Sequence, residues 1–450
     1  MHNTHLNIFV FVLAIGATAF PDDDSLLFWA RRAKRGVKIF IYPKIPDPTY
    51  PTYHSFASYN ASAHECNPHF LMERKFPEYI RNTIVETTNP RRADFFLIDH
   101  DYSCFFSTNV NNSLGKRLEH EFSEKYLTAV MANVVQNFPY YNKSGGLDHL
   151  MVFTLDRGRC EMALHPGLHD IIPYYEPVTF IGNFGFAQED ISFETMQFGK
   201  FAFSTGRTVT RRLPRCTLFG SGRNIVIPQF HEWVPEPYDR RLRRYHSVFV
   251  GRVKRGGLSG VNVRPILLNI HAIGFPGFYA SDLSNASLSS ITLRDSYFSL
   301  CPGGAAPWSV RMYDAIYHHS IPVILADGIV LPFEKFLDWK SFTVKQSSDY
   351  VSVQDGVELL KQLRKHAANA MRNKITTLKY SKSDITKTFI HTKLENAVGV
   401  MPWLSWNEAS PRSAYGLLML ELWCRKFGYV APICRPMMVN SSEIAYLEYW

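Results

Sequence analysis

The sequence predicts an α/β protein with two successive units of parallel strands and covering helices. Short β-branched or aromatic runs alternate with helical patterns along most of the chain, as they do in parallel sheets. One unit is readable by itself: the run Tyr297–Cys301, a Pro-Gly-Gly loop, apolar residues at helical spacing, and the run Ile321–Leu325. A chain of 450 residues with 46% apolar side chains is long enough for more than one core.

The first unit is expected over residues 20–237, because the chain divides near Pro235–Tyr238. Its predicted buried strands are Lys38–Tyr42, Phe95–Asp99 and Leu150–Thr154. A helical pattern at Leu118–Val135 precedes the third strand. This alternation predicts a first sheet with helices packed on it.

The second unit is expected over residues 238–400. Its five predicted strands are Ser247–Val250, Gly277–Tyr279, Tyr297–Cys301, Ile321–Leu325 and Phe342–Val344. The stretch Asp355–Lys379 places apolar side chains at helical spacing, which predicts a long amphipathic helix. A final segment, 401–450, contains a predicted terminal helix at Ser413–Phe427.

The loop after Tyr297–Cys301 predicts an anion site. Gly303 and Gly304 allow a ligand to approach the backbone, and Pro307 suits a first helical turn, where a missing N–H costs nothing. The unpaired N–H groups of such a helix, with Ser309 in the same segment, favour a pyrophosphate. We therefore expect these residues to bind a nucleotide-sugar donor.

Two charged residues on that predicted helix sharpen the expectation. Arg311 and Asp314 lie one turn apart on one face. A guanidinium there suits phosphate, and a carboxylate suits ribose hydroxyls. The alternative is an ordinary surface ion pair, which the spacing alone favours.

Several long motifs follow one another in a fixed order. They are Lys38-Ile-Phe-Ile-Tyr42, Arg92-Ala-Asp-Phe-Phe-Leu-Ile98, Phe138-Pro-Tyr-Tyr-Asn-Lys-Ser-Gly-Gly-Leu-Asp-His149, Asn224-Ile-Val-Ile-Pro228, Phe249-Val-Gly-Arg252 and the stretch from Ser299 to Trp339. With these motifs the chain resembles the exostosin-like glycosyltransferases of family 47, over roughly residues 38–353. Two positions depart from the family: Asp314 stands where Glu is usual, and Leu155 stands where plant members often have His before the residue equivalent to Asp156.

The resemblance implies a GT-B fold, in which two Rossmann-like domains face each other across a cleft. It also implies an inverting transferase that moves a sugar from a UDP-sugar to a polysaccharide or glycoprotein glycan, in a complex with other glycosyltransferases in some cases. The UDP-sugar is then a co-substrate, and no other cofactor is expected. No Asp-x-Asp element stands at a convincing strand end, so we expect metal-independent transfer. The two departures keep an alternative open, a non-catalytic secretory subunit that binds glycans or partners.

An inverting transfer needs a base for the acceptor hydroxyl and positive charge for the leaving diphosphate. Asp156 is the first candidate base, because it follows a predicted strand at its carboxyl end. His149 is the second, although a buried structural role is equally consistent with its place after a glycine turn. Arg252, just after a predicted strand, and Arg311 are the candidate cations for the diphosphate.

Other polar residues remain as further candidates on the acceptor side. Asp99, His100 and Asp101 end a predicted strand, and His231 and Glu232 stand near the expected boundary between the units.

The N-terminus predicts entry into the secretory pathway. Leu6–Phe20 is mostly apolar and contains Ala17-Thr-Ala19, a signal-peptidase pattern, so cleavage after Ala19 is expected. The alternative is that residues 1–19 form a short uncleaved anchor, as in transferases resident in the Golgi lumen. Sequons support a secretory route and predict N-glycans at Asn60, Asn111, Asn285 and Asn440. A fifth sequon, at Asn142, lies inside a family-like motif, where a glycan could collide with substrate.

The seven cysteines do not follow metal-site spacing, so an oxidising compartment predicts up to three disulfides and one leftover thiol. Cys424 and Cys434 are a plausible local pair, and Cys301 is the expected free thiol because it ends a buried strand. The net charge of +9 is scattered in short clusters, which suits anionic sugar nucleotides, acidic glycans or lipid headgroups. The absence of a zinc-finger or RNA-binding signature argues against a nucleic-acid ligand.

Overall fold

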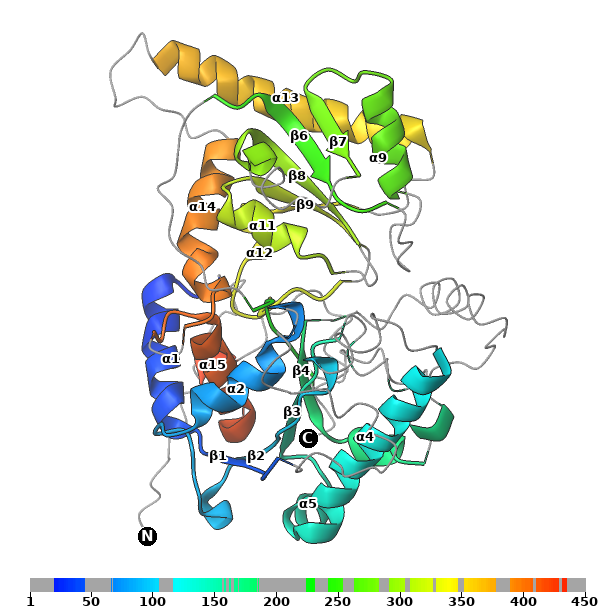
Figure 1. Cartoon of the computed structure of the whole chain (residues 1–450). Coiled ribbons are helices and arrows are strands. Elements are labelled where there is room, and N and C mark those ends of the chain that lie inside the picture. The colour runs from blue at the N-terminus through cyan, green and yellow to red at the C-terminus, as the bar shows by residue number, and fades with distance from the viewer. Residues whose placement is uncertain are drawn as a thin grey trace, which may run out of the picture.

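A computed structural model describes residues 20–44, 66, 68–104, 116–155, 158, 162, 166–168, 170–183, 185, 224–230, 242–253, 263–282, 291–303, 308–326, 329–346, 352–377, 389–407, 410–428 and 431–434. Side chains are described for all of these except residues 116–122 and 370–377. This part of the chain forms two five-stranded parallel sheets, each covered by helices (Figure 1). The predicted α/β class is therefore confirmed.

The first sheet has its strands in chain order. They are β1 (Ile39–Ile41), β2 (Phe95–Ile98), β3 (His149–Val152), β4 (Thr179–Gly182) and β5 (Ile225–Val226), all parallel. Neighbouring residues of β2 enter different cores, because side chains alternate across a sheet: Phe95 and Leu97 on one face, Phe96 and Ile98 on the other. All four are buried, which makes β2 an interior strand with both faces covered.

Helices cover both faces of this first sheet. α4 (Lys116–Asn137) lies across the sheet from α1 (Asp23–Gly36), with α5 (Tyr140–Ser144) below it in the view of Figure 1. The remaining helical pieces are η2 (Pro68–Phe70), α2 (Met72–Ile80), η3 (Pro90–Arg92), η6 (Pro166–Leu168) and α6 (Ile172–Tyr175). The predicted helix at Leu118–Val135 is confirmed as the greater part of α4.

The second sheet reverses its strand order once. Its strands are β6 (Tyr245–Val250), β7 (Phe278–Ser281), β8 (Ser296–Pro302), β9 (Ile321–Leu325) and β10 (Val344–Gln346), arranged as β10-β9-β8-β6-β7. The chain leaves β6 for β7 on one side and reaches β8 on the other, so the switch point lies between β6 and β8. All five predicted strands are present. β10 begins at the last predicted residue, because Phe342 ends a short buried helix, α12 (Trp339–Phe342).

The helices of the second unit are α9 (Val263–Ala272), α11 (Arg311–Tyr317), α13 (Val353–Thr377) and α14 (Phe389–Leu404). α13 confirms the predicted amphipathic helix, since Leu360, Leu363 and Ala367 are buried against α9 and the sheet. α11 begins later than predicted. Trp308 and Ser309 are not helical, so the expectation of a first helical turn at Pro307 is wrong, and Gly304 and Pro307 lie outside the described residues.

The last helix returns to the first unit. α15 (Ala414–Phe427) is capped by Ser413, whose Oγ accepts a bond from the Gly416 N–H at 3.1 Å, and it confirms the predicted terminal helix. It packs on α1, where the rings of Trp29 and Trp423 are 5.3 Å apart (Figure 1). A short turn, η9 (Pro432–Cys434), follows it.

The two sheets turn their carboxyl ends toward each other. The segment after β9 meets the segments after β4 and β5: Val330 N–H donates to Gly185 at 3.0 Å, and Phe333 N–H to Val226 at 3.4 Å. Trp406, beyond α14, donates its indole N–H to the carbonyl of Pro228 at 3.1 Å. One apolar core runs through this junction and includes residues of both units. Two parallel α/β units joined in this way form the GT-B arrangement, which confirms that prediction.

Two disulfides join Cys66 to Cys104 and Cys424 to Cys434, and Cys301 is a buried free thiol. The predictions for Cys301 and for the local pair are confirmed. The sequons at Asn60, Asn111, Asn285 and Asn440 lie outside the described residues. Among the helices that the structure describes, none is both long and apolar enough to cross a bilayer.

Candidate functional site

The switch point of the second sheet is the natural place for a ligand, because the loops after β6 and β8 leave in different directions there. Gly251 and Arg252 follow β6, and Gly303 follows β8. The Gly303 N–H donates to Leu325 at 3.3 Å and so holds the ends of β8 and β9 together. Arg252 points its side chain into solvent at this edge.

Arg311 places its guanidinium at the carboxyl end of β6. Its Nε donates to the carbonyl of Val250 at 2.6 Å, and its Nη1 donates to the Ser309 hydroxyl at 3.1 Å. A Cβ added to Gly251 would lie 1.9 Å from Nη2 of Arg311, so only glycine leaves room for this approach. The guanidinium also lies over the ring of Phe249, at 5.5 Å from its centre.

A second buried arginine, Arg264, bridges the ends of β6 and β8. It stands in the first turn of α9, and its Nη1 and Nη2 donate to the carbonyls of Arg252 at 2.7 Å and Pro302 at 3.3 Å. Its Nε is buried and has no hydrogen-bond partner among the described residues. Burial, with the nearby charge of Arg311, lowers the pKa of Arg264 to about 10, so it stays charged at neutral pH.

Arg264 stands outside the sequence motifs described above, although one local signal marks it. A positive side chain in the first turn of a helix is unfavourable because it opposes the helix dipole. An arginine at that position therefore indicates a role other than stabilising the helix. The structure supplies a geometric one, since the side chain reaches both strand ends.

Asp314 lies on α11 one turn after Arg311. Burial raises the pKa of Asp314 to about 6, against the opposing effect of the Arg311 charge. Arg311 directs its side-chain hydrogen bonds to Val250 and Ser309, so the two residues do not form the simple surface pair that their spacing favours. The edge therefore carries the buried guanidinium of Arg264, the partly buried guanidinium of Arg311 and the carboxyl of Asp314, whose charge varies near neutrality.

His149 is placed away from this junction. It begins β3, so it lies at the amino edge of the first sheet, and its ring is fully buried between other rings. Nε2 lies 2.7 Å from the Tyr42 hydroxyl and Nδ1 lies 2.7 Å from Asp148. With both nitrogens satisfied and the carboxyl edge a strand's length away, the structure argues against His149 as the base and favours the buried structural role.

Asp156 lies outside the described residues, as do Gly304, His231 and Glu232. The residue before Asp156, Leu155, is buried. The strand leading to it, β3, ends at the carboxyl edge that faces the second unit. Asp156 therefore remains a prediction for the base.

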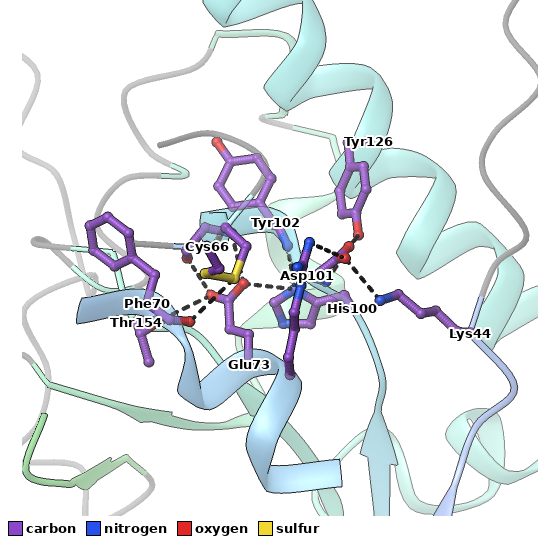
Figure 2. A network of polar contacts seen from close by, with 12 residues as sticks. Lys44, Cys66, Phe70, Glu73, His100, Asp101, Tyr102, Tyr126 and Thr154 are labelled. Carbon is purple, nitrogen blue, oxygen red and sulfur yellow. Dashed lines mark hydrogen bonds and ion pairs between the residues drawn. A yellow bond between two sulfur atoms is a disulfide. The ribbon is translucent and has the colours of Figure 1, made fainter. Parts of the chain in front are cut away.

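Asp101 is the centre of a charged cluster at the carboxyl end of β2 (Figure 2). Its carboxylate lies 2.9 Å from Lys44 and 3.2 Å from Arg74, and it accepts a bond from the Tyr126 hydroxyl at 3.1 Å. Burial acts to raise the pKa of Asp101, but the charges of Lys44 and Arg74 and the hydrogen bonds from Lys44 and Tyr126 together outweigh it, so the pKa is lowered. Asp99 points elsewhere and pairs with Arg81.

Comparison with known proteins agrees with these features. A family model described as the Exostosin GT47 domain matches residues 33–363. Among curated proteins, "Probable beta-1,4-xylosyltransferase IRX10L" of Arabidopsis thaliana is 26% identical over 298 residues, which are 62% of this chain and 61% of that protein. "Probable glucuronosyltransferase 47 A" of Physcomitrium patens is 25% identical over 318 residues, 67% of this chain and 64% of that protein.

Among solved structures, one titled "Crystal Structure of TarM" aligns with a TM-score of 0.29 at 10% identity, over 64% of this chain and 57% of that one. The chain spans about three-fifths of the length of the curated relatives that it matches, 61% in the first case. The family match itself covers well over half of the chain and takes in both parallel sheets, with β10 ending at Gln346 inside it. This chain belongs to the exostosin GT47 family.

Proposed function

We propose that this protein is an inverting glycosyltransferase that moves a sugar from a UDP-sugar to a hydroxyl of a glycan acceptor. The observation that carries the proposal is the pair of guanidiniums at the carboxyl ends of β6 and β8, the buried Arg264 and the partly buried Arg311. Both are bonded to backbone carbonyls, which carry no net charge, and Asp314 is the nearby carboxyl that acts on Arg311. A nucleoside diphosphate supplies the matching negative charge.

The same groups have a role in the reaction step. As the bond between the anomeric carbon and the diphosphate breaks, negative charge grows on the diphosphate. Arg264 and Arg311 are already fixed by their carbonyl bonds, so they stabilise that charge without reorganising. Because the guanidiniums supply the positive charge, we propose that transfer requires no metal ion.

The carboxyl edge of the first sheet is the proposed place for the acceptor, since it faces the donor edge across the junction of the units. A base there takes the acceptor proton as the oxygen attacks. Asp156 is the proposed base, because the segment after β3 carries it to this edge. Polysaccharide hydroxyls are the proposed acceptors and the Golgi lumen is the proposed compartment, as membership of the exostosin GT47 family suggests.

A second candidate function is a non-catalytic glycan-binding or partner subunit. The observation that favours it is the position after β3: Leu155 is buried and cannot relay a proton to Asp156 as a histidine could. The replacement of a usual Glu by Asp314 points the same way, because it shortens the reach toward a ribose.

One experiment separates the two functions. The purified secreted protein is incubated with a panel of UDP-sugars, with and without EDTA, and the release of UDP is measured. The proposed enzyme releases UDP from one sugar in both conditions, and Arg311→Ala abolishes the release. Arg244→Ala is the matched control, because Arg244 is an exposed arginine of the same unit that stacks on Tyr245. A folded protein that releases no UDP from any sugar would refute the proposed transfer, and glycan binding by that protein would then support the second function.

A further inference from the structure

A buried glutamate, Glu73, joins the carboxyl ends of β2 and β3 (Figure 2). Glu73 lies on α2 and is 1% exposed. Its Oε2 accepts a bond from the backbone N–H of Ser103 at 2.7 Å, and its Oε1 accepts one from the backbone N–H of Thr154 at 3.0 Å. The hydroxyls of Ser103 and Thr154 also bond to Oε1, the latter at 3.4 Å.

The Glu73 carboxyl is held by hydrogen bonds rather than by a cation. The nearest basic group in its contacts is Nδ1 of His100, 3.6 Å from Oε2. Burial lowers the pKa of His100 to about 4, so that ring is neutral near pH 7. Burial likewise raises the pKa of Glu73 to about 8, with the donors from Ser103 and Thr154 acting against this.

Another buried glutamate shows how different this environment is. Glu421 on α15 lies 2.8 Å from Lys335 and 3.0 Å from Arg425, so it has two cations of its own. Burial acts to raise the pKa of Glu421, but the charges of Lys335 and Arg425 lower it to about 2. Glu73 has the same burial without such partners. A group that costs this much to bury is expected to perform a task that a neutral apolar side chain could not.

The two backbone groups that Glu73 binds belong to the two loops of the acceptor edge. Ser103 is in the loop that carries Asp101, and Asp101 in turn holds Lys44 and Arg74. Thr154 is two residues before Asp156. The Thr154 hydroxyl also donates to the carbonyl of Phe70 in η2 at 3.2 Å, beside the Cys66–Cys104 disulfide. The hydrogen bonds around Glu73 therefore extend to η2.

We propose that Glu73 is a positioning residue for the acceptor: its carboxyl fixes the loops after β2 and β3 relative to each other and so sets where the acceptor hydroxyl and its base meet. The inference rests on the proposed transferase function and deepens it, because it assigns the acceptor half of the site to residues remote from the donor arginines. Glu73 touches neither substrate. It acts through Ser103 and Thr154.

Glu73→Gln is the direct test. Glutamine has one carbonyl oxygen and an NH₂ group that can only donate, so it cannot accept from both backbone N–H groups as the carboxylate does, which predominates above about pH 8. In hydrogen exchange at about pH 9, the amide of Ser103 or that of Thr154 should lose protection. At the same pH, with the UDP-sugar identified above, the ratio of transfer to xylohexaose over hydrolysis by water should fall about tenfold, because water needs no oriented acceptor. The shift of melting temperature by UDP should be unchanged, since the donor arginines lie in the other unit.

Glu78→Gln is the matched control, since Glu78 lies on the same helix, is exposed and pairs with Lys75. Should Glu73→Gln fail to fold, Ser103→Ala removes one hydroxyl donor and keeps the backbone N–H; it should lower the same ratio by a smaller factor. If the wild type does not transfer sugar to xylohexaose, the acceptor in this assay is instead the glycan that most accelerates UDP release by the wild type.

The outcomes separate the two claims. A wild type without any UDP release refutes the proposed function, and the inference falls with it. A wild type that transfers sugar, with Glu73→Gln giving the same ratio of transfer to hydrolysis, refutes the inference alone. A folded Glu73→Gln that loses hydrolysis and transfer equally also refutes it, since the defect would not be specific to the acceptor.

The pH profile gives a readout that a purely structural role would not move. The titratable groups around Glu73 are His100, Asp101 and Tyr126, while Lys44 and Arg74 pair with Asp101. The nearby carboxylate of Asp101 raises the pKa of Glu73 further. The wild-type ratio of transfer to hydrolysis should therefore change around pH 8 as Glu73 ionises. The Glu73→Gln profile should be flat there, and a wild-type profile with no inflection in that range would contradict the proposal.

Discussion

The carboxyl edges of the two sheets face each other but carry opposite chemistry. The edge of the second sheet has Arg264 and Arg311, both held by backbone carbonyls and both charged. The edge of the first sheet has the carboxyls of Glu73 and Asp101, held by N–H groups, hydroxyls and cations. Under the proposed function, the edge of the second sheet binds the diphosphate and the edge of the first sheet binds the acceptor hydroxyl. Two sheets of the same architecture thus differ in the polar groups at their carboxyl ends.

The largest expected effect comes from closing the space that Arg311 uses. Gly251→Ala places a Cβ 1.9 Å from Nη2 of Arg311 and forces the guanidinium off the end of β6. We expect UDP affinity to fall about 100-fold, or about 2.8 kcal/mol, in a calorimetric titration. Gly399→Ala is the control, since a Cβ there meets nothing within 4 Å. Unchanged UDP affinity in Gly251→Ala would remove Arg311 from the donor edge.

A change outside both edges should affect stability without affecting either substrate. Glu421→Gln leaves Lys335 and Arg425 without their carboxylate, and we expect a loss of about 2 kcal/mol, discounted because Lys335 is 37% exposed. Urea unfolding measures it. The folded pKa is about 2 and the reference value is 4.5, so this stabilisation is complete above 4.5 and disappears as pH falls toward 2. UDP affinity should remain that of the wild type; a large drop would mean that the edges are not independent of α15.

Arg264 should matter less than Arg311, because its bonds also serve the two strand ends. Arg264→Gln keeps one N–H donor for the carbonyl of Arg252 but loses the charge. We expect about a tenfold loss of UDP affinity, close to 1.4 kcal/mol. Arg244→Gln serves as the control for removal of one positive charge from the same unit. If both variants weaken UDP equally, the effect of Arg264 is only long-range attraction.

The smallest effect is expected from Asp314, and it should depend on pH. With the pKa of Asp314 at about 6, the carboxylate that could accept bonds from ribose hydroxyls forms only as pH rises through that value. Asp314→Asn has no such transition. The ratio of wild-type to variant UDP affinity should therefore rise about threefold between about pH 5 and about pH 7.5. A constant ratio would separate Asp314 from the nucleotide.

The sequence predicted the second sheet well and the first one only in part. β8 and β9 are continuous apolar runs between loop residues, which makes them readable without neighbours. β5 has only two residues, so it offers no period to detect. β4 has four residues, as β2 and β3 do, but unlike them it stands in none of the motifs described above. Such short strands form because they hydrogen-bond to neighbouring strands of the sheet. This pairing depends on tertiary contacts and cannot be read from the local sequence.

The candidate site divides in the same way. Arg311 was found because a motif surrounds it, whereas Arg264 and Glu73 were missed because their roles depend on distant partners. The role of Glu73 depends on its hydrogen bonds with Ser103 and Thr154, which are 30 and 81 residues away along the chain. His149 was selected for its chemistry, but its place at the buried start of β3 depends on where the sheet begins pairing.

The return of α15 to α1 has a consequence for the order in which the protein folds during synthesis. The indole of Trp403 donates to Asp23 across 380 residues at 2.6 Å, and Lys426 donates to the carbonyl of Gly36 across 390 residues at 2.9 Å. The helix that packs most closely on α1 is therefore missing until α15 has been synthesised. The second unit, whose sheet is built from one continuous stretch, can fold before α1 and α15 meet. A nascent chain that stops before α15 should expose part of the apolar face of α1 and engage chaperones.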